Sequence, residues 1–142
     1  SNVEKEILDN EEFFNLIKSP DKTNSGNAIC SSAFKIARDL SLKIMVIMTE
    51  SGSTGNTMSS FRPSSLIFAM TPSDKVYRKL SLTWGVFPIK VNKFKSTDQM
   101  LKFCRKFFID NSMIKKGEQF IMTAGIPVGI TGSTNMIKIE TI

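Results

Sequence analysis

The sequence predicts a three-layer α/β/α fold built on a five-stranded, mostly parallel sheet whose last strand runs antiparallel. Short apolar runs alternate with helix-like patterns along the chain, and the first four runs are apolar throughout, as buried parallel strands are. The final run, Met136 to Thr141, instead alternates apolar with polar residues and follows a loop. We therefore expect it to be an antiparallel strand at a half-exposed edge.

The helices are expected where apolar residues recur at helical spacing. An acidic amphipathic helix is predicted from Val3 to Lys18. A second helix, capped by Asn24 or Ser25, is predicted from the helical spacing of its apolar residues, which are Ala28, Ile29, Ala33, Ile36, Ala37 and Leu40. Three further helices are predicted over Asn56–Arg62, Asp74–Trp84 and Thr97–Asn111. Gly85 stands where the C-cap of a helix favours glycine, and Ser96 to Gln99 has the form of a capping box.

Five strands are expected between these helices: Lys43–Met48, Leu66–Met70, Val86–Val91, Gln119–Thr123 and Asn135–Ile142. The whole chain, residues 1–142, is predicted to be a single domain. Residues 1–23 form its leading helix and linker, and residues 24–142 form its α/β core.

Composition predicts a soluble globular domain, with 41% hydrophobic and 23% charged residues and no run near the ~20 apolar residues of a membrane span. No signal peptide opens the chain, and Ser1-Asn2 without a Met is interpreted as a tag remnant or a cut from a longer chain. Cys30 and Cys104 lie among apolar neighbours, which favours free, buried thiols in a reducing, cytoplasmic compartment.

The net charge of +6 favours anionic partners, but its distribution does not indicate nucleic acid. Basic residues occur as scattered pairs, and no nucleic-acid module motif is present. In the predicted last helix, Phe107 and Phe108 are expected in the core. Phe103 falls on the polar side, so both a core position and a contact with a partner remain open for it.

The segment from Thr49 to Asn56 is the most informative one, because hydroxyls and glycines crowd a strand-to-helix turn. Backbone amides at a helix start have no intrahelical partner and favour anions, and glycine lets a ligand approach closely. The segment therefore indicates a phosphate site, although it lacks the P-loop lysine. Ordinary helix capping by Ser or Thr is the alternative. The loop from Ala124 to Thr134 is expected at the same carboxyl edge of the sheet.

Several short runs, taken in order, carry a family resemblance over residues 28–142. They are Ala28-Ile29-Cys30-Ser31-Ser32-Ala33, Thr49-Glu50-Ser51-Gly52, Phe61-Arg62-Pro63, Ile67-Phe68-Ala69-Met70-Thr71-Pro72, Trp84-Gly85-Val86, Lys95-Ser96-Thr97-Asp98, Lys116-Gly117-Glu118, Thr123-Ala124-Gly125-Ile126-Pro127-Val128-Gly129 and Gly132-Ser133-Thr134-Asn135. In these runs the chain resembles the C-terminal domain of pyruvate kinase. That enzyme transfers a phosphoryl group between phosphoenolpyruvate and ADP in glycolysis.

The resemblance implies a regulatory α/β domain with no cofactor of its own, beside a catalytic barrel that holds Mg²⁺ and K⁺ and is absent here. It implies a sugar-phosphate or nucleotide effector at one loop and assembly into a homotetramer. Carried over residue by residue, the expected phosphate-binding positions are Thr49, Glu50, Ser51, Gly52, Ser53, Thr54, Gly132 and Ser133. Neither a nucleic acid nor a membrane is an expected partner.

Two departures from relatives that bind fructose 1,6-bisphosphate weaken the expectation of a bisphosphate. Glu50 puts a carboxylate where some relatives have Lys, and the Ala124–Thr134 loop has no Arg or Lys. A monophosphorylated sugar, a nucleotide monophosphate or no effector at all remain open. In the last case the chain would be an assembly domain with a vestigial site.

Catalysis by this chain alone is not expected. The sequence has no histidine and no recognisable nucleophile–base pair, so no catalytic residue and no metal ligand is predicted. The early acidic residues, at positions 4 to 12, are interpreted as a solvated helix face.

Overall fold

The computed structural model of the chain describes residues 25–125 and 134–142. The predicted helix over Val3–Lys18 lies outside these residues. The elements follow one another as α2 (Ser25–Asp39), β1 (Ile44–Met48), α3 (Ser53–Ser60), β2 (Leu66–Thr71), α4 (Asp74–Leu80), β3 (Val86–Lys90), α5 (Thr97–Asp110), β4 (Gln119–Ala124) and β5 (Met136–Thr141).

The described strands form one sheet in the order β3-β2-β1-β4-β5. The pairs β1–β2, β1–β4 and β2–β3 are parallel, and β4–β5 is antiparallel. The predicted fold class is therefore confirmed, including the antiparallel last strand at an edge. β5 is only partly buried, as its alternating sequence predicts, whereas β1 is buried throughout.

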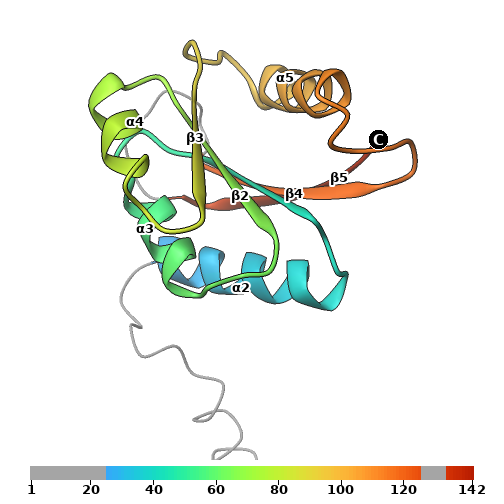
Figure 1. Cartoon of the computed structure of the whole chain (residues 1–142), viewed down its shortest axis with the longest axis horizontal. Coiled ribbons are helices and arrows are strands. Elements are labelled where there is room, and N and C mark those ends of the chain that lie inside the picture. Colours follow the sequence, from blue (N-terminus) through green and yellow to red (C-terminus); the bar gives the residue numbers. More distant parts are fainter. Residues whose placement is uncertain (1–24, 126–133) are drawn as a thin grey trace, which may run out of the picture.

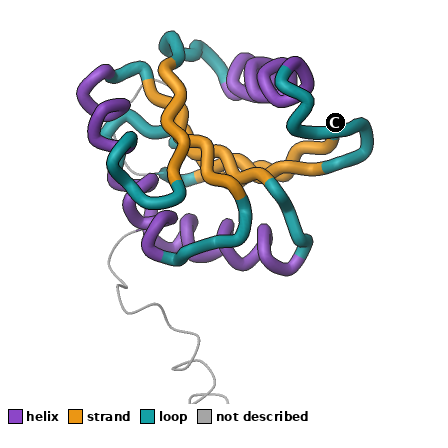
Figure 2. Tube along the Cα trace, in the orientation of Figure 1, coloured by secondary structure: helices purple, strands orange, loops and turns teal. Residues whose placement is uncertain are grey.

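Helices cover both faces of the sheet (Figures 1 and 2). On one face, α2, α3 and α4 bury a cluster that includes Ala33, Met58 and Leu80 against the odd-numbered side chains of β1 and β2. On the other face α5 is the one helix among the described elements, and its Met100, Cys104 and Phe108 recur every four residues, so they share one side of the helix. This is the three-layer arrangement that the sequence predicts.

The aromatic residues of α5 belong largely to the domain itself. Phe108 is fully buried and meets Phe68 and Phe120 edge to face, with ring centroids 5.2 and 5.5 Å apart. Phe103 is half-buried, lies 5.5 Å from the ring of Phe94 and stacks on Phe107 at 6.2 Å. Of the two positions open for Phe103, the structure favours packing at the border of the core.

Several boundaries differ from those that the sequence predicts. Helix α3 begins at Ser53, three residues earlier than predicted, and α4 ends at Leu80 instead of Trp84. Gly85 is therefore not the C-cap of α4, which is Ser81; Gly85 lies in the following turn with φ +68°. Helix α2 ends at Asp39, so Leu40, the last residue of the predicted apolar spacing, lies just beyond the helix and is 49% exposed.

The predicted capping box is only half formed. Ser96 Oγ accepts a hydrogen bond from Gln99 N, as expected of the N-cap of α5. The Gln99 side chain, however, accepts from Lys95 N at 2.8 Å rather than from Ser96 N.

Candidate functional site

The candidate site begins where β1 ends, at the carboxyl edge of the parallel strands. Thr49 N donates to Met70 O at 3.0 Å, which continues the ladder to β2 for one residue beyond β1. Thr49 is buried, and its Oγ1 accepts from Gly52 N at 2.9 Å. This hydrogen bond closes a tight turn, so the Thr49 hydroxyl holds the loop in shape.

The backbone conformation of Gly52 lets the chain turn from β1 into α3. It is the N-cap of α3 with φ +84°, a left-handed conformation that side-chain-bearing residues rarely adopt. A Cβ at this position would lie 3.2 Å from Val76 Cγ1. Gly52 has no side chain to cap α3, but Ser51 Oγ accepts a hydrogen bond from Ser53 N at 3.3 Å, so part of the hydroxyl content of the loop serves the helix start itself.

The start of α3 presents polar groups suited to an anion. The amides of Thr54 and Gly55 belong to the first turn and have no hydrogen-bond partner within the described part of the chain. Ser51 and Ser53 are exposed, and their hydroxyl oxygens lie 3.0 Å apart. Two hydroxyls and two amides thus lie together at the positive end of the helix dipole.

Thr54 joins this loop to the start of β5. Its buried Oγ1 lies 2.9 Å from Oγ1 of Thr134, which is also buried. The two predicted site loops therefore meet at the carboxyl edge of the sheet, through a residue outside the predicted set. Thr134 stands in the run Gly132-Ser133-Thr134-Asn135, so the signal was present in the sequence. Gly132 and Ser133 themselves lie outside the described residues.

Glu50 is half-buried and carries the only charge in the sequence between Thr49 and Asn56. This stretch contains no Lys or Arg. A bound anion would therefore depend on amides, hydroxyls and the helix dipole, with one carboxylate opposing it.

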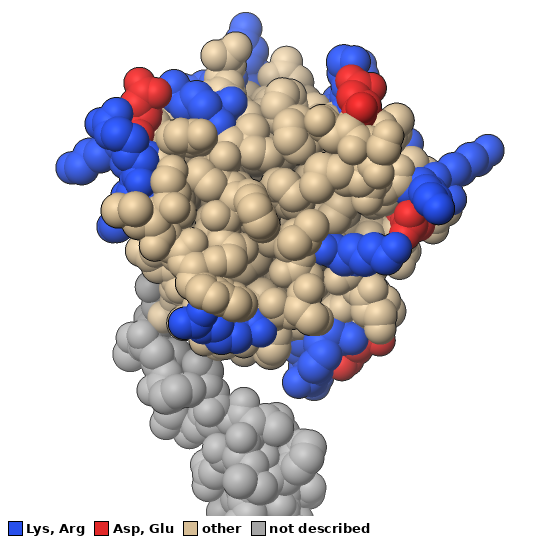
Figure 3. Space-filling model, in the orientation of Figure 1, with Lys and Arg blue, Asp and Glu red and all other residues tan. Residues whose placement is uncertain are grey.

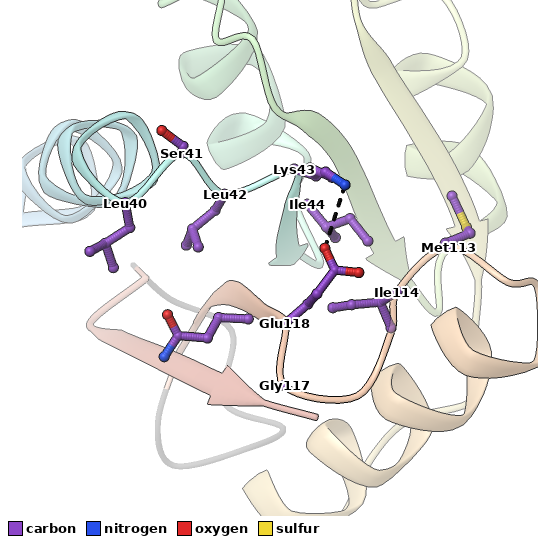
Figure 4. A pocket seen from close by; sticks show the side chains of 10 residues that line it. Leu40, Ser41, Leu42, Lys43, Ile44, Met113, Ile114, Gly117 and Glu118 are labelled. Atoms are coloured by element: carbon purple, nitrogen blue, oxygen red, sulfur yellow. Dashed lines mark ion pairs between the residues drawn. The ribbon is translucent and has the colours of Figure 1, made fainter.

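A separate pocket lies at the opposite, amino edge of the sheet (Figure 4). It has a volume of about 240 Å³, and Leu42, Ile44 and Ile114 contribute buried apolar side chains to its lining. Lys43 Nζ lies 3.5 Å from Glu118 Oε2 at this pocket. The Lys115 amide, and to a lesser extent Lys43, lower the pKa of Glu118. None of the predicted site residues lines it.

Metal-binding side chains and cysteines were the other candidate groups for chemistry in residues 25–125 and 134–142. The described residues contain no group of three or more His, Cys, Asp or Glu residues that could hold a metal ion. Cys30 and Cys104 are free and buried, as predicted, and burial raises their thiol pKa values to about 11 and about 12. Both thiols are therefore protonated at neutral pH. None of the helices in residues 25–125 and 134–142 could span a membrane.

The fold is an open α/β sheet with a hydroxyl- and glycine-rich loop at the carboxyl ends of its strands, the edge at which ligands bind in folds of this class. The family model described as "Pyruvate kinase, alpha/beta domain" matches residues 27–140. The chain therefore belongs to the pyruvate kinase α/β domain family.

Individual relatives agree with this assignment. A pyruvate kinase of Clostridium acetobutylicum is 35% identical over 125 residues, which are 88% of this chain and 26% of that protein. A pyruvate kinase of Staphylococcus aureus is 42% identical over 119 residues, 84% of this chain and 20% of that protein. The crystal structure of a pyruvate kinase from Cryptosporidium parvum superposes with a TM-score of 0.75 at 27% identity, covering 86% of this chain and 23% of that one.

The chain thus spans about a quarter or less of the length of these relatives.

Proposed function

We propose that this chain is a regulatory domain that binds a phosphorylated small molecule at the Thr49–Thr54 loop. The observation that carries the proposal is the geometry of the α3 start, where the Thr54 and Gly55 amides and the Ser51 and Ser53 hydroxyls lie together. A phosphate would accept hydrogen bonds from all four groups and interact favourably with the helix dipole.

Within the predicted set, the hydroxyls have two different roles. Those of Thr49 and Thr54 are buried and hydrogen-bonded to Gly52 and Thr134, so they shape the loop. The hydroxyls of Ser51 and Ser53 are exposed and can turn to a ligand. Glu50 contributes through its backbone, and Gly132 and Ser133 remain expected neighbours from the second loop.

The effector class that fits best carries one phosphate. The Thr49–Asn56 stretch offers one cluster of amides and hydroxyls, and the sequence from Ala124 to Thr134 has no Arg or Lys to hold a second phosphate. A sugar monophosphate or a nucleotide monophosphate therefore fits better than a bisphosphate. The net charge of +6 favours either anion at long range.

The Thr54–Thr134 contact would couple effector binding at the start of α3 to the position of β5 at the edge of the sheet. Thr134 is two residues before β5, and Asn135 N donates to Ala124 O at 3.0 Å, next to the start of that strand. An effector that orders the α3 start would thereby stabilise one position of β5. Coupling of this kind amounts to about 1–3 kcal/mol and is reciprocal between the ligand and the assembly.

Calorimetric titration at low salt tests the site, with ribose 5-phosphate, glucose 6-phosphate, AMP and fructose 1,6-bisphosphate as separate ligands. We expect saturable binding of a monophosphate and its loss in the double variant Ser51→Ala/Ser53→Ala. Ser60→Ala, which removes an exposed hydroxyl at the other end of α3, is the matched control and should bind normally. Unchanged affinity in the double variant would remove the loop as the binding site.

A second candidate function is assembly alone, and the exposed edge of β5 favours it. β5 pairs only with β4, and its other edge carries no strand among the described residues. An open, alternating edge strand invites pairing with another copy. Sedimentation velocity on wild type and on Ile139→Lys, with and without each ligand, separates the two functions. Self-association that depends on Ile139 but not on any ligand would favour an assembly domain.

The whole-protein context belongs to the same proposal. We expect the domain to act within a cytoplasmic, tetrameric pyruvate kinase, beside a barrel that converts phosphoenolpyruvate and ADP to pyruvate and ATP. We propose that Mg²⁺ and K⁺ are bound in that barrel, outside this domain. The isolated chain should accordingly show no kinase activity.

A further inference from the structure

The pocket at the amino edge of the sheet lies where two helices end and two strands begin (Figure 4). Leu40 and Ser41 follow the end of α2, and Met113 follows the end of α5. Lys43 precedes β1, and Glu118 precedes β4. The volume of about 240 Å³ is below the roughly 300–1,000 Å³ of pockets for drug-sized ligands, so an occupant must be small.

Apolar side chains line the pocket from both sides. Leu42 and Ile44 come from the segment between α2 and β1, whereas Met113 and Ile114 come from the segment between α5 and β4. Leu42, Ile44 and Ile114 are buried, and Leu40 at the rim is 49% exposed. Covering these groups removes apolar surface from water, so the pocket favours a ligand with an apolar body.

The two charges at the pocket differ in how firmly they are held. Glu118 Oε1 accepts a hydrogen bond from Lys115 N at 2.8 Å, which lowers the pKa of Glu118 and keeps it ionised at neutral pH. Its Oε2 lies 3.5 Å from Lys43 Nζ, longer than the ~2.7–2.9 Å of a strong charge-assisted hydrogen bond. The Lys43 side chain is 78% exposed. The carboxylate is therefore a fixed acceptor, and its present cation is loosely held.

The local electrostatic field favours a cation at this edge, but only a singly charged one. Helices α2 and α5 both end beside the pocket, and the C-terminal end of a helix carries partial negative charge. Over the molecule as a whole, Lys and Arg exceed Asp and Glu by six charges, and blue side chains project all around the rim in Figure 3. A ligand with a second positive charge would be repelled by this excess.

We propose that this pocket binds a small primary ammonium ion with an apolar body, whose ammonium group pairs with Glu118 in place of Lys43. The apolar body would cover Leu42, Ile44 and Ile114. The site lies at the opposite edge of the sheet from the Thr49–Thr54 loop, so the proposal does not depend on the proposed function of that loop.

The test titrates the chain at pH 7 and low salt with four molecules that share a five-carbon chain and differ in their end groups. They are n-pentylamine, 1-pentanol, pentanoate and 1,5-diaminopentane. Primary amines of this kind are protonated at pH 7, as lysine is. Binding is followed by two-dimensional ¹H–¹⁵N NMR at the backbone amides of Ser41, Gly117 and Glu118. We expect saturable shifts with n-pentylamine, and weaker binding by about fivefold or more for each of the other three.

Three variants assign the roles of the two charges. Glu118→Gln keeps an oxygen that can accept from Lys115 N but loses the charge, and should weaken n-pentylamine binding by about tenfold or more. Lys43→Gln removes the competing cation and should tighten binding by up to about fivefold. Asp74→Asn removes one carboxylate at the carboxyl edge and is the matched control, with unchanged affinity. The amide spectrum of each variant reports whether the fold is intact.

Several outcomes would overturn the proposal. The first is the absence of saturable shifts at the three amides, and the second is unchanged n-pentylamine affinity in a folded Glu118→Gln variant. Equal binding of 1-pentanol would mean that the pocket recognises only the apolar chain. Tighter binding of pentanoate, lost in Lys43→Gln, would assign the pocket to an anion held by Lys43.

Discussion

The two edges of the parallel sheet differ in chemistry. At the carboxyl edge, the turn after β1 is built from hydroxyls, glycines and backbone amides, and it leaves hydrogen-bond donors exposed. At the amino edge, Leu66, Leu82 and Trp84 expose large apolar side chains. Parallel strands bring all carboxyl ends to one side, so the fold separates a polar edge rich in hydroxyls from an edge with exposed apolar side chains.

The largest expected effect compares one glycine from each edge. Gly52 and Gly85 both have positive φ, but a Cβ on Gly52 would meet Val76 at 3.2 Å, whereas a Cβ on Gly85 would meet no atom within 4 Å. We expect Gly52→Ala to lower the free energy of unfolding by about 2–3 kcal/mol and Gly85→Ala by about 1 kcal/mol, the backbone cost alone. Urea denaturation measures both. Equal losses would show that the contact with Val76 relaxes freely.

A smaller effect concerns the buried hydroxyl pair at the carboxyl edge. Thr54→Val leaves the Thr134 hydroxyl buried without its partner, and should cost about 1–2 kcal/mol of stability. The double variant Thr54→Val/Thr134→Val removes both hydroxyls and should recover most of this loss.

At the amino edge, Ser59→Ala removes the donor to Trp84 O and serves for comparison. The exposed position of Trp84 lets water replace the lost donor, so the loss should be smaller than for Thr54→Val. If the losses in Thr54→Val and in the single variant Thr134→Val simply added up in the double variant, the Thr54–Thr134 hydrogen bond would contribute nothing to the coupling between the loop and β5.

Much of the fold could be predicted because periodicity reports burial directly. β5 alternates and is half-exposed, whereas the run Ile44–Met48 is apolar and fully buried. The termini of α3 and α4 were less predictable. The start of α3 depends on the left-handed conformation of Gly52, and the early end of α4 depends on a turn from Ser81 to Gly85 that has no strong signal in the sequence.

The candidate site was predictable in position but not in detail. The Thr49–Thr54 loop does lie at the carboxyl edge of the sheet, as a strand-to-helix turn must. Which hydroxyls are buried depends on tertiary contacts: Thr54 reaches Thr134, which is 80 residues away in the sequence. The exposure of Leu82 and Trp84 could not be predicted either, because a short apolar stretch after a helix pattern looks like core.

The next prediction concerns the charge at the carboxyl edge. A carboxylate at about 5 Å from a phosphate opposes binding by about 1 kcal/mol in partly exposed surroundings. Glu50→Gln should therefore tighten binding of AMP or ribose 5-phosphate by up to about fivefold at low salt, and less at high salt. Glu118→Gln at the amino edge is the control and should leave affinity unchanged. Weaker binding in Glu50→Gln would mean that this carboxylate organises the loop.

The smallest expected difference concerns Asp74 and Asp98, each in the first turn of its helix. Asp74 Oδ1 lies 2.9 Å from Lys90 Nζ, and hydrogen bonding and charge from Lys90 lower the pKa of Asp74 below its ordinary value of 3.8. Asp98 forms no ion pair with any residue that the structure describes.

A carboxyl group whose pKa is lowered by folding stabilises the fold above its unfolded pKa, and that contribution disappears as the pH falls through the lowered value. Asp74→Asn should therefore reduce the stability lost between pH 7 and pH 3 more than Asp98→Asn does. The change should be small because the Asp74–Lys90 pair is exposed and screened by solvent.

Thermal unfolding of both variants at pH 7 and at pH 3 measures this difference in stability. Identical pH profiles for the two variants would mean that the helix dipole, common to both positions, accounts for the whole effect and that the ion pair with Lys90 adds nothing.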